Sequence, residues 1–293
     1  MTLPGLFLAA AVAIAPPPRF FIAGDGQLTI LNAHTDERVQ AQYRGPDRRY
    51  DPATLRRISH VFRSRGDDRE IPVSLRLVEI LSRLQRLTGG KPLVLLSGYR
   101  STDYNQELKQ RGGQVAGGSM HTEGLAADLA FPRPELPALW QKVRALDCCG
   151  AGMYRQEGFM HVDVGRPRFW EPSTSRVDEN LSAGNARLLA RTEFDRYAAG
   201  ETITVSVHAL TVPPVLIERH ARLVPERGDS VRVAVVGDLP EHDGCLELGA
   251  SRAQVRVPEA PAVHGRAKLV LTTCTPRVEH TPETLETNPI EIL

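Results

Sequence analysis

The stretch SMHTEGLAADL, from Ser119 to Leu129, decides how the first half of the chain folds. It places His121 seven residues before Asp128, with Gly124 between them. Side chains that share a helix face are three or four residues apart, and glycine is unfavourable inside a helix. The pattern instead predicts a loop that carries His121, a tight turn at Gly124 and a strand that carries Asp128. A loop and a strand can bring these two side chains to one point.

The stretch GFMHVDVG, at 158–165, shows the alternation of a half-buried strand. On such a strand His161 and Asp163 share one face, whereas Met160 and Val162 point toward the core. Because unpaired buried polar groups are costly, the two polar side chains need partners. Catalytic zinc sites use three protein ligands, commonly His nitrogen and carboxylate oxygen, plus water. The predicted zinc ligands are His121, Asp128 and His161.

Three stretches together resemble the zinc D-Ala-D-Ala carboxypeptidase and murein endopeptidase family, part of the lysostaphin/D-Ala-D-Ala/hedgehog (LAS) superfamily. They are SGYRS at 97–101, SMHTEGLAADL at 119–129 and GFMHVDVG at 158–165. The second stretch follows the family pattern SxxH…GxAxD, except that Ser119 stands two residues before the histidine. The likeness covers roughly residues 24–172, and it is to the branch of exported cell-wall endopeptidases of Gram-negative bacteria.

The resemblance implies an α+β, LAS/hedgehog-like metallopeptidase domain that holds one zinc ion per chain through His121, Asp128 and His161. It also implies that Arg100 lies near the substrate carbonyl, where its charge would stabilise the developing oxyanion. The alternative role for Arg100 is a salt bridge that holds its loop in place.

The general base is indicated less directly. Carboxypeptidases of the family carry a glutamate three residues before the last histidine ligand, and Gly158 occupies that position here. Asp163, on the same strand face as His161, is the preferred candidate because a base must reach the water at hydrogen-bond distance. Glu157 is the alternative base. Asp163 could instead orient a ligand histidine through an outer hydrogen bond.

The pattern of apolar and polar residues changes near residue 172. Amphipathic helices and short strands are predicted before it, whereas alternating apolar runs separated by Pro, Gly and Asp clusters predict an all-β, sandwich-like region after it. We therefore expect a signal peptide or N-terminal anchor at 1–23, a metallopeptidase domain at 24–172 and a β-rich domain with a loose tail at 173–293. We also expect the metallopeptidase domain to fold and bind zinc without the β-rich domain.

Composition and the N-terminus bear on partners and location. A net charge of +1 and 5% aromatic residues give no basis for nucleic-acid binding. The apolar run 3–15 suits a signal peptide and is too short to span a membrane, so we expect export to the periplasm or cell envelope. In that compartment Cys245 and Cys274 could form a disulfide; the alternative is two buried thiols.

The leading functional prediction is a zinc-dependent endopeptidase that hydrolyses peptide cross-links in peptidoglycan. One alternative is a D,D-carboxypeptidase or dipeptidase that trims stem peptides, and another is a zinc-bearing but inactive cell-wall binding module. An enzyme that trims chain ends needs a fixed cation for the terminal carboxylate. The candidates are Arg111, Arg155 and Arg166, and no pattern selects one of them. The lack of a clear carboxylate clamp favours the endopeptidase.

Overall fold

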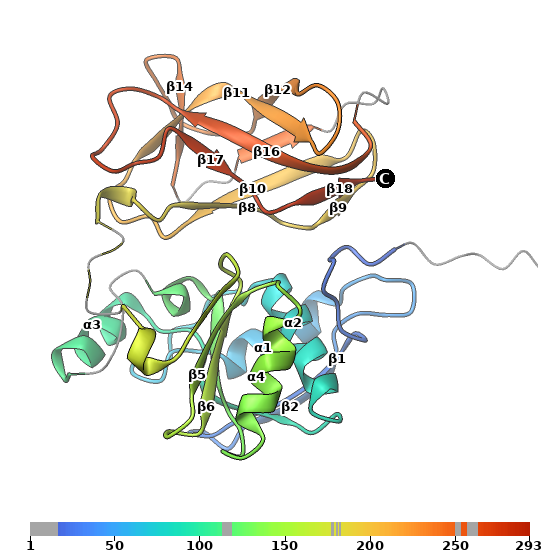
Figure 1. Cartoon of the computed structure of the whole chain (residues 1–293), viewed down its shortest axis with the longest axis vertical. Helices are drawn as coiled ribbons and strands as arrows, with labels where there is room; N and C mark the ends of the chain where they lie inside the picture. Colours follow the sequence, from blue (N-terminus) through green and yellow to red (C-terminus); the bar gives the residue numbers. More distant parts are fainter. Residues whose placement is uncertain are drawn as a thin grey trace, which may run out of the picture.

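The computed structural model describes residues 17–112, 119–176, 179, 181, 183–249, 253–256 and 263–293. A mixed α/β region comes first and a largely β region follows, and Figure 1 shows the second above the first. The predicted combination of an α+β part and a β-rich part is confirmed at this level. Most of the expected leader, residues 1–23, lies outside the described residues.

Seven strands of the first region form one mixed sheet, in the order β2-β1-β3-β4-β6-β5-β7. The pairs β1/β3 and β5/β7 are parallel, and the other neighbouring pairs are antiparallel. The strands are β1 Gln27–Asn32, β2 Arg38–Gln42, β3 Leu93–Ser97, β4 Ala126–Ala130, β5 Gly150–Tyr154, β6 Phe159–Asp163 and β7 Arg168–Trp170. The predicted strands around Asp128 and His161 are therefore confirmed.

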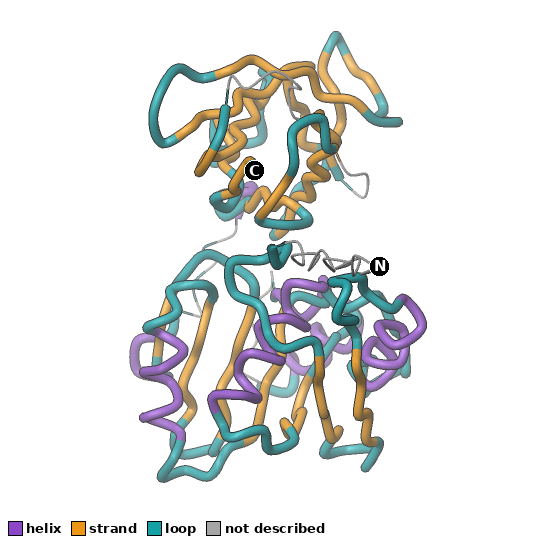
Figure 2. The backbone as a smooth tube through the Cα atoms, turned by 90° about the vertical axis from the view of Figure 1, so that its right-hand side faces the viewer, coloured by secondary structure: helices purple, strands orange, loops and turns teal. Residues whose placement is uncertain are grey.

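The helices of this region pack beside the sheet around one apolar core (Figure 2). They are α1 Pro52–Val61, α2 Leu75–Leu87, α3 Thr102–Gln110 and α4 Leu136–Arg144. Asp51 caps the N-terminus of α1, because its carboxylate accepts hydrogen bonds from the N–H groups of Ala53 and Thr54. The apolar stripe of α2 buries Leu77 and Leu81 completely. None of the described helices is long and apolar enough to cross a membrane.

The described strands of the second region pair mainly in the order β8-β10-β15-β12-β11-β16-β18-β9, with β13, β14 and β17 beside this path. The strands are β8 Leu189–Thr192, β9 Arg196–Tyr197, β10 Thr202–His208, β11 Val215–Pro225, β12 Val231–Val236, β13 Glu241–His242, β14 Cys245–Leu248, β15 Ala253–Arg256, β16 Gly265–Thr273, β17 Thr284–Glu286 and β18 Ile290–Ile292. Their inward side chains form a second core, which includes Ile203, Val205 and Leu269.

The expectation of a loose C-terminal tail is wrong. β17 and β18 both pair with β16, and β18 also pairs in parallel with β9. Leu285, Ile290 and Ile292 are buried in the second core. Each of these strands has only three residues, which is too short for alternation to stand out among the polar residues around it.

Both cysteine pairs form disulfides. Cys245 on β14 is joined to Cys274, which follows β16, so the alternative of two buried thiols does not hold here. Cys148 and Cys149 are joined as well, although sequence neighbours rarely bond to each other. The first of these bonds ties two separate strands of the β region together.

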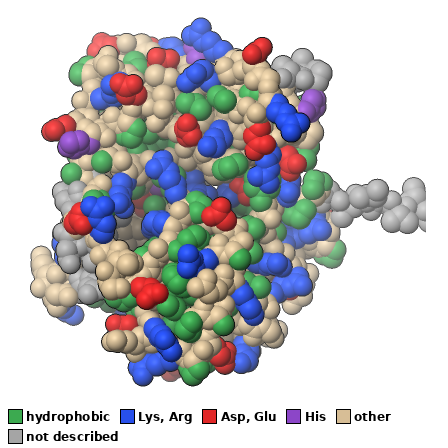
Figure 3. All heavy atoms as spheres, in the orientation of Figure 1, with side chains coloured by type: hydrophobic (Ala, Val, Ile, Leu, Met, Phe, Trp, Pro, Cys, Tyr) green, Lys and Arg blue, Asp and Glu red, His purple; other side chains and the backbone are tan. Residues whose placement is uncertain are grey.

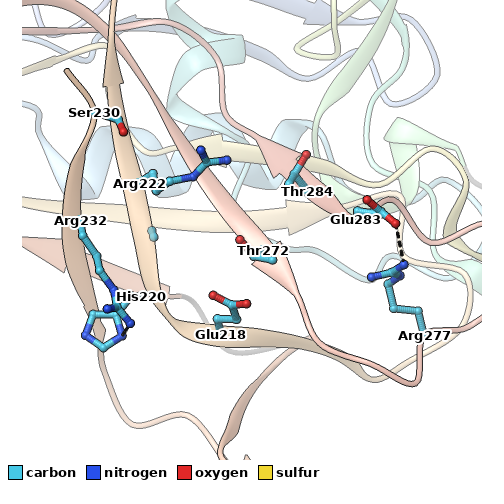
Figure 4. A pocket seen from close by; sticks show the side chains of 10 residues that line it. Glu218, His220, Arg222, Ser230, Arg232, Thr272, Arg277, Glu283 and Thr284 are labelled. Atoms are coloured by element: carbon cyan, nitrogen blue, oxygen red, sulfur yellow. Dashed lines mark hydrogen bonds and ion pairs between the residues drawn. The ribbon is translucent and has the colours of Figure 1, made fainter. Parts of the chain in front are cut away.

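A polar pocket of about 480 Å³ opens on the β region, between β11, β12, β16 and β17 (Figure 4). Arg222 of β11 and Arg232 of β12 stand directly opposite each other in the strand register. At the other side of the pocket Arg277 forms an ion pair with Glu283. The β region thus has a surface pocket of its own, formed without residues of the first sheet.

The two regions are held together by a buried junction. Arg76 of α2 forms an ion pair of 2.5 Å with Asp195, which lies between β8 and β9, and both side chains are almost fully buried. Asp195 also accepts a hydrogen bond from the N–H of Phe21, and Phe20 is buried beside Arg76. In Figure 3, Lys and Arg side chains lie along this junction. Residues 17–23, at the end of the expected leader, therefore belong to the folded part of the chain.

Candidate metal centre

Strand register brings Asp128 and His161 together. In the antiparallel pair β4/β6 these two residues stand directly opposite each other, although 33 positions separate them in the sequence. On the other side of β4, Ser97 at the end of β3 stands opposite Asp128. Because directly opposite side chains share one face of a sheet, Asp128 and His161 reach the same point in space.

His121 approaches this point from a short 3₁₀ helix, η1 Met120–Glu123, and not from an irregular loop. The helix ends at Gly124, whose φ of 67° forms the predicted glycine turn. The Nδ1–H of His121 donates to the carbonyl oxygen of Gly98 at 2.6 Å. Gly98 can lie there because it has no side chain, since a Cβ would come within 2.6 Å of the Phe62 carbonyl oxygen. This contact turns the Nε2 of His121 toward the cluster.

The three predicted ligands converge. The Nδ1 of His161 lies 2.9 Å from Oδ1 of Asp128 and 3.2 Å from Nε2 of His121. The Nε2 of His121 lies 3.3 Å from the same carboxylate oxygen. Two imidazole nitrogens and one carboxylate oxygen are a donor set that suits zinc and leaves a further coordination position open. The residues present therefore fit a metal ion.

Arg100 touches the carboxylate of this cluster. Its Nη2 donates to Oδ2 of Asp128 at 2.9 Å, and its Nε donates to the hydroxyl of Ser97 at 2.9 Å. This contact matches the salt-bridge alternative for Arg100 and keeps the other carboxylate oxygen directed at the histidines.

Asp163 lies behind His161, away from Asp128. It is fully buried and accepts a hydrogen bond from the Nε2–H of His161 at 2.8 Å. Arg168 and the N–H of Gly165 donate to the same carboxylate. Asp163 is therefore bonded to the ring nitrogen opposite the one that faces the cluster. This is the geometry of the outer-hydrogen-bond alternative.

Glu157, the alternative base, is at the far end of the same hairpin. It is exposed in the turn between β5 and β6. It lies four positions before His161, on the other side of the turn at Gly158, and the strand from Phe159 to His161 alone spans roughly 7 Å. The turn thus holds the Glu157 carboxylate away from the histidine.

The charges of the cluster are set by its neighbours. Burial alone would raise the pKa of Asp128, but the two histidines hold it well below its ordinary value. Burial lowers the pKa of His121, which favours a neutral ring with a free lone pair on Nε2. Burial would also lower the pKa of His161, but the carboxylates of Asp128 and Asp163 raise it to about 9. The metal-free cluster therefore carries a proton on His161 at neutral pH.

Metal binding should consequently weaken as the pH falls. A metal ion needs the lone pair of His161 Nδ1, which is protonated below a pKa of about 9, so binding must displace one proton. We expect the apparent affinity to fall about tenfold for each pH unit below this pKa. Calorimetric titration with zinc in buffers of different ionisation enthalpy measures the released proton directly. An affinity that does not change with pH would contradict the protonated cluster.

The aromatic side chain of Trp170 lies beside His161. The indole of Trp170 on β7 has its centre 5.3 Å from the imidazole centre, and its Nε1–H donates to the Tyr154 hydroxyl. Gly152 on β5 stands opposite His161 and makes room for the indole, since a Cβ there would lie 2.4 Å from it. Nothing in the sequence of β5, GAGMY, singles out Gly152, so this role is apparent from the structure alone.

A groove of about 440 Å³ leads away from Asp128 and Arg100. The other lining residues are Asn32, His34, Thr35, Arg63, Arg65, Asp68, Leu95, Leu96, Ser97, Gly98, Tyr99, Tyr104 and Leu108. Among the described lining residues, the cations besides Arg100 are Arg63 and Arg65, which the sequence patterns did not single out. The three predicted clamp candidates do not line it.

A family model described as peptidoglycan L,D-endopeptidase MepK matches residues 23–170, which contain the whole cluster. The chain belongs to this family. The peptidoglycan L,D-endopeptidase MepK of Escherichia coli (strain K12) is 34% identical over 167 residues, which are 56% of this chain and 91% of that protein. The probable MepK of Haemophilus influenzae is 25% identical over 163 residues, 55% of this chain and 83% of that protein. The family match confirms the predicted kinship with cell-wall peptidases, and it ends at residue 170, before β8.

Proposed function

We propose that the chain is a zinc-dependent endopeptidase that hydrolyses peptide cross-links of peptidoglycan in the periplasm or cell envelope. The convergence of His121, Asp128 and His161 within the MepK-family region carries the proposal. The relatives are named as L,D-endopeptidases, which favours a cross-link of the L,D type here. The disulfide between Cys245 and Cys274 supports an oxidising compartment.

A zinc ion bound by the three ligands would supply Lewis-acid chemistry, polarising a carbonyl and activating water. The remaining residues orient that site. The carbonyl of Gly98 holds His121, and Asp163 holds His161 with Nδ1 toward Asp128. Arg100 is paired with Asp128 and lines the groove, and in this proposal its positive charge would also stabilise negative charge that develops on the scissile carbonyl.

Digestion of purified sacculi tests this function against its two rivals. The wild-type protein should release monomers from L,D-cross-linked dimers, and a chelator should abolish the reaction until zinc is restored. Release of free D-Ala from uncross-linked stems, with dimers left intact, would replace the proposal with a carboxypeptidase. Zinc-dependent binding to sacculi without any cleavage would identify a binding module.

The groove points to a carboxylate-bearing substrate. Arg63 is already paired with Glu37 at 2.5 Å and with Asp68 at 3.3 Å. Arg65 lies 3.3 Å from Nε2 of His34, but that nitrogen donates to the Leu96 carbonyl and cannot also accept. With His34 in this tautomer, which the shorter 2.9 Å contact to Leu96 favours, the exposed Arg65 has no hydrogen-bond acceptor among the described residues. We propose that it binds a free carboxylate of the stem peptide.

The Arg65→Gln variant should lower kcat/KM about 10- to 100-fold on cross-linked peptides with free carboxylates, because it removes one charge-assisted hydrogen bond. On the same peptides with these carboxylates amidated, variant and wild type should be nearly equal. Arg155→Gln, in the exposed turn between β5 and β6, is the matched control. An equal loss on both kinds of peptide would show that Arg65 does not recognise the carboxylate.

A further inference from the structure

The β region contacts the helix that carries His121. The ring Nδ1–H of His208, at the end of β10, donates to Oε2 of Glu123 at 2.7 Å. The N–H of Ala209 donates to the other oxygen of the same carboxylate at 2.8 Å. Glu123 is the last residue of η1, two positions after His121. The MepK-family match ends at residue 170. Glu123 therefore lies within the matched region, whereas both donors lie beyond it.

The two donors of this contact are held in place by hydrogen bonds within the β region. Ala209 has a φ of 58°, a conformation that residues with a Cβ rarely adopt. Asn185, which is fully buried, stabilises the following turn: its Oδ1 accepts from the N–H groups of Thr211 and Val212. Its Nδ2 donates to the carbonyl of Val212. Strained backbone persists where the surroundings determine it, and here it directs two donors at one carboxylate.

The helix η1, which carries the acceptor Glu123, needs contacts with other segments to stay folded. η1 has only four residues, and so short a 3₁₀ helix has little stability of its own. Its own region holds it through the bond of His121 to Gly98 and through the N–H of Ser74, which donates to Gly124. The Glu123 carboxylate is the part of η1 that the β region holds.

A second contact reaches the segment after His161. Arg191 of β8, 7% exposed, donates to the carbonyl oxygen of Gly165 at 2.7 Å. The N–H of the same glycine donates to Asp163, which in turn holds His161. The β region therefore contacts the segments that carry two of the three candidate ligands.

We propose that the β region positions His121 and His161 for metal binding, with His208, Ala209 and Arg191 as the positioning residues. This inference rests on the metal centre of the proposed function. If docking of the β region favours the metal-binding geometry, then metal binding must strengthen that docking by the same factor.

Three variants of the full chain test the proposal with zinc alone. His208→Ala removes the donor to Glu123, whereas His208→Asn restores one, because the Asn Nδ2 occupies nearly the position of the imidazole Nδ1. His242→Ala is the matched control, since His242 of the β region also bonds a glutamate, Glu247, at the surface. We expect His208→Ala to bind zinc about 10-fold more weakly in competition with a chromogenic chelator. His208→Asn should recover most of this affinity, and His242→Ala should match the wild type.

Backbone amide hydrogen exchange tests the coupling directly, because a change in overall stability alone would not make protection at 208–212 depend on zinc. Zinc should slow exchange at 208–212 in the wild type and not in His208→Ala. If His208→Ala binds zinc as tightly as the wild type, the proposal fails while the metal centre stands. A wild-type protein that binds no zinc overturns both the metal centre and this proposal.

Discussion

The His161→Ala variant should lose its metal and its activity together. It removes one of three donors, and it leaves the buried carboxylate of Asp163 without the imidazole that it accepts from. The loss of zinc affinity should exceed the roughly 100-fold that loss of an outer hydrogen bond costs. Equilibrium dialysis with metal analysis measures the affinity, and digestion of cross-linked dimers measures the activity.

The control for this variant is His60→Ala, which removes an exposed imidazole bonded to Glu70 in the same region. It should keep full metal content and turnover. Circular dichroism confirms that both variants are folded. Full zinc occupancy in folded His161→Ala would exclude His161 as a ligand.

The Asp163→Asn variant should have the second largest effect. An amide can present either its oxygen or its NH₂ group to His161, so the ring no longer has one enforced tautomer. The variant also removes the charge partner of Arg168. We expect zinc affinity to fall about 10- to 100-fold, as for other outer partners of metal-bound histidines, with turnover largely recovered at saturating zinc.

The same variant separates the two roles that the sequence left open for Asp163. If Asp163 were the general base, the variant would keep its metal and lose about 10²- to 10⁴-fold in turnover even at saturating zinc. Glu157→Gln, at the exposed turn, should leave both quantities unchanged. A large loss in that variant would move the base to Glu157.

The cluster of His121, Asp128 and His161 was predictable because each of these residues interrupts a local pattern. His121 precedes a glycine turn, and Asp128 and His161 are polar residues on otherwise apolar strands. The register that puts Asp128 opposite His161 was not predictable from local pattern, because it depends on pairing between strands far apart in sequence. The 3₁₀ helix of His121 was missed for a similar reason, since its support comes from Gly98 and Ser74.

Residues whose contacts are with distant parts of the chain could not be recognised from the sequence pattern around them. Arg65 sits in a run of charged and polar residues, which is typical of an exposed loop. His208 ends an alternating strand, and only the junction of the two regions gives it a partner in Glu123. The β18 strand was missed because its burial depends on β16 and β9 on either side of it.

Because of its position, Trp170 can serve as an intrinsic fluorescence probe of the candidate site. The chain has two tryptophans, and Trp140 is buried in the first core with its Nε1–H bonded to the Ala151 carbonyl. Trp170 instead lies beside His161, and a nearby positive charge interacts with the π electrons of an indole. Fluorescence from Trp170 should therefore respond to the charge state of His161, whereas that of Trp140 in the first core should stay nearly constant. The expected metal binding and its rate could then be followed without any attached dye.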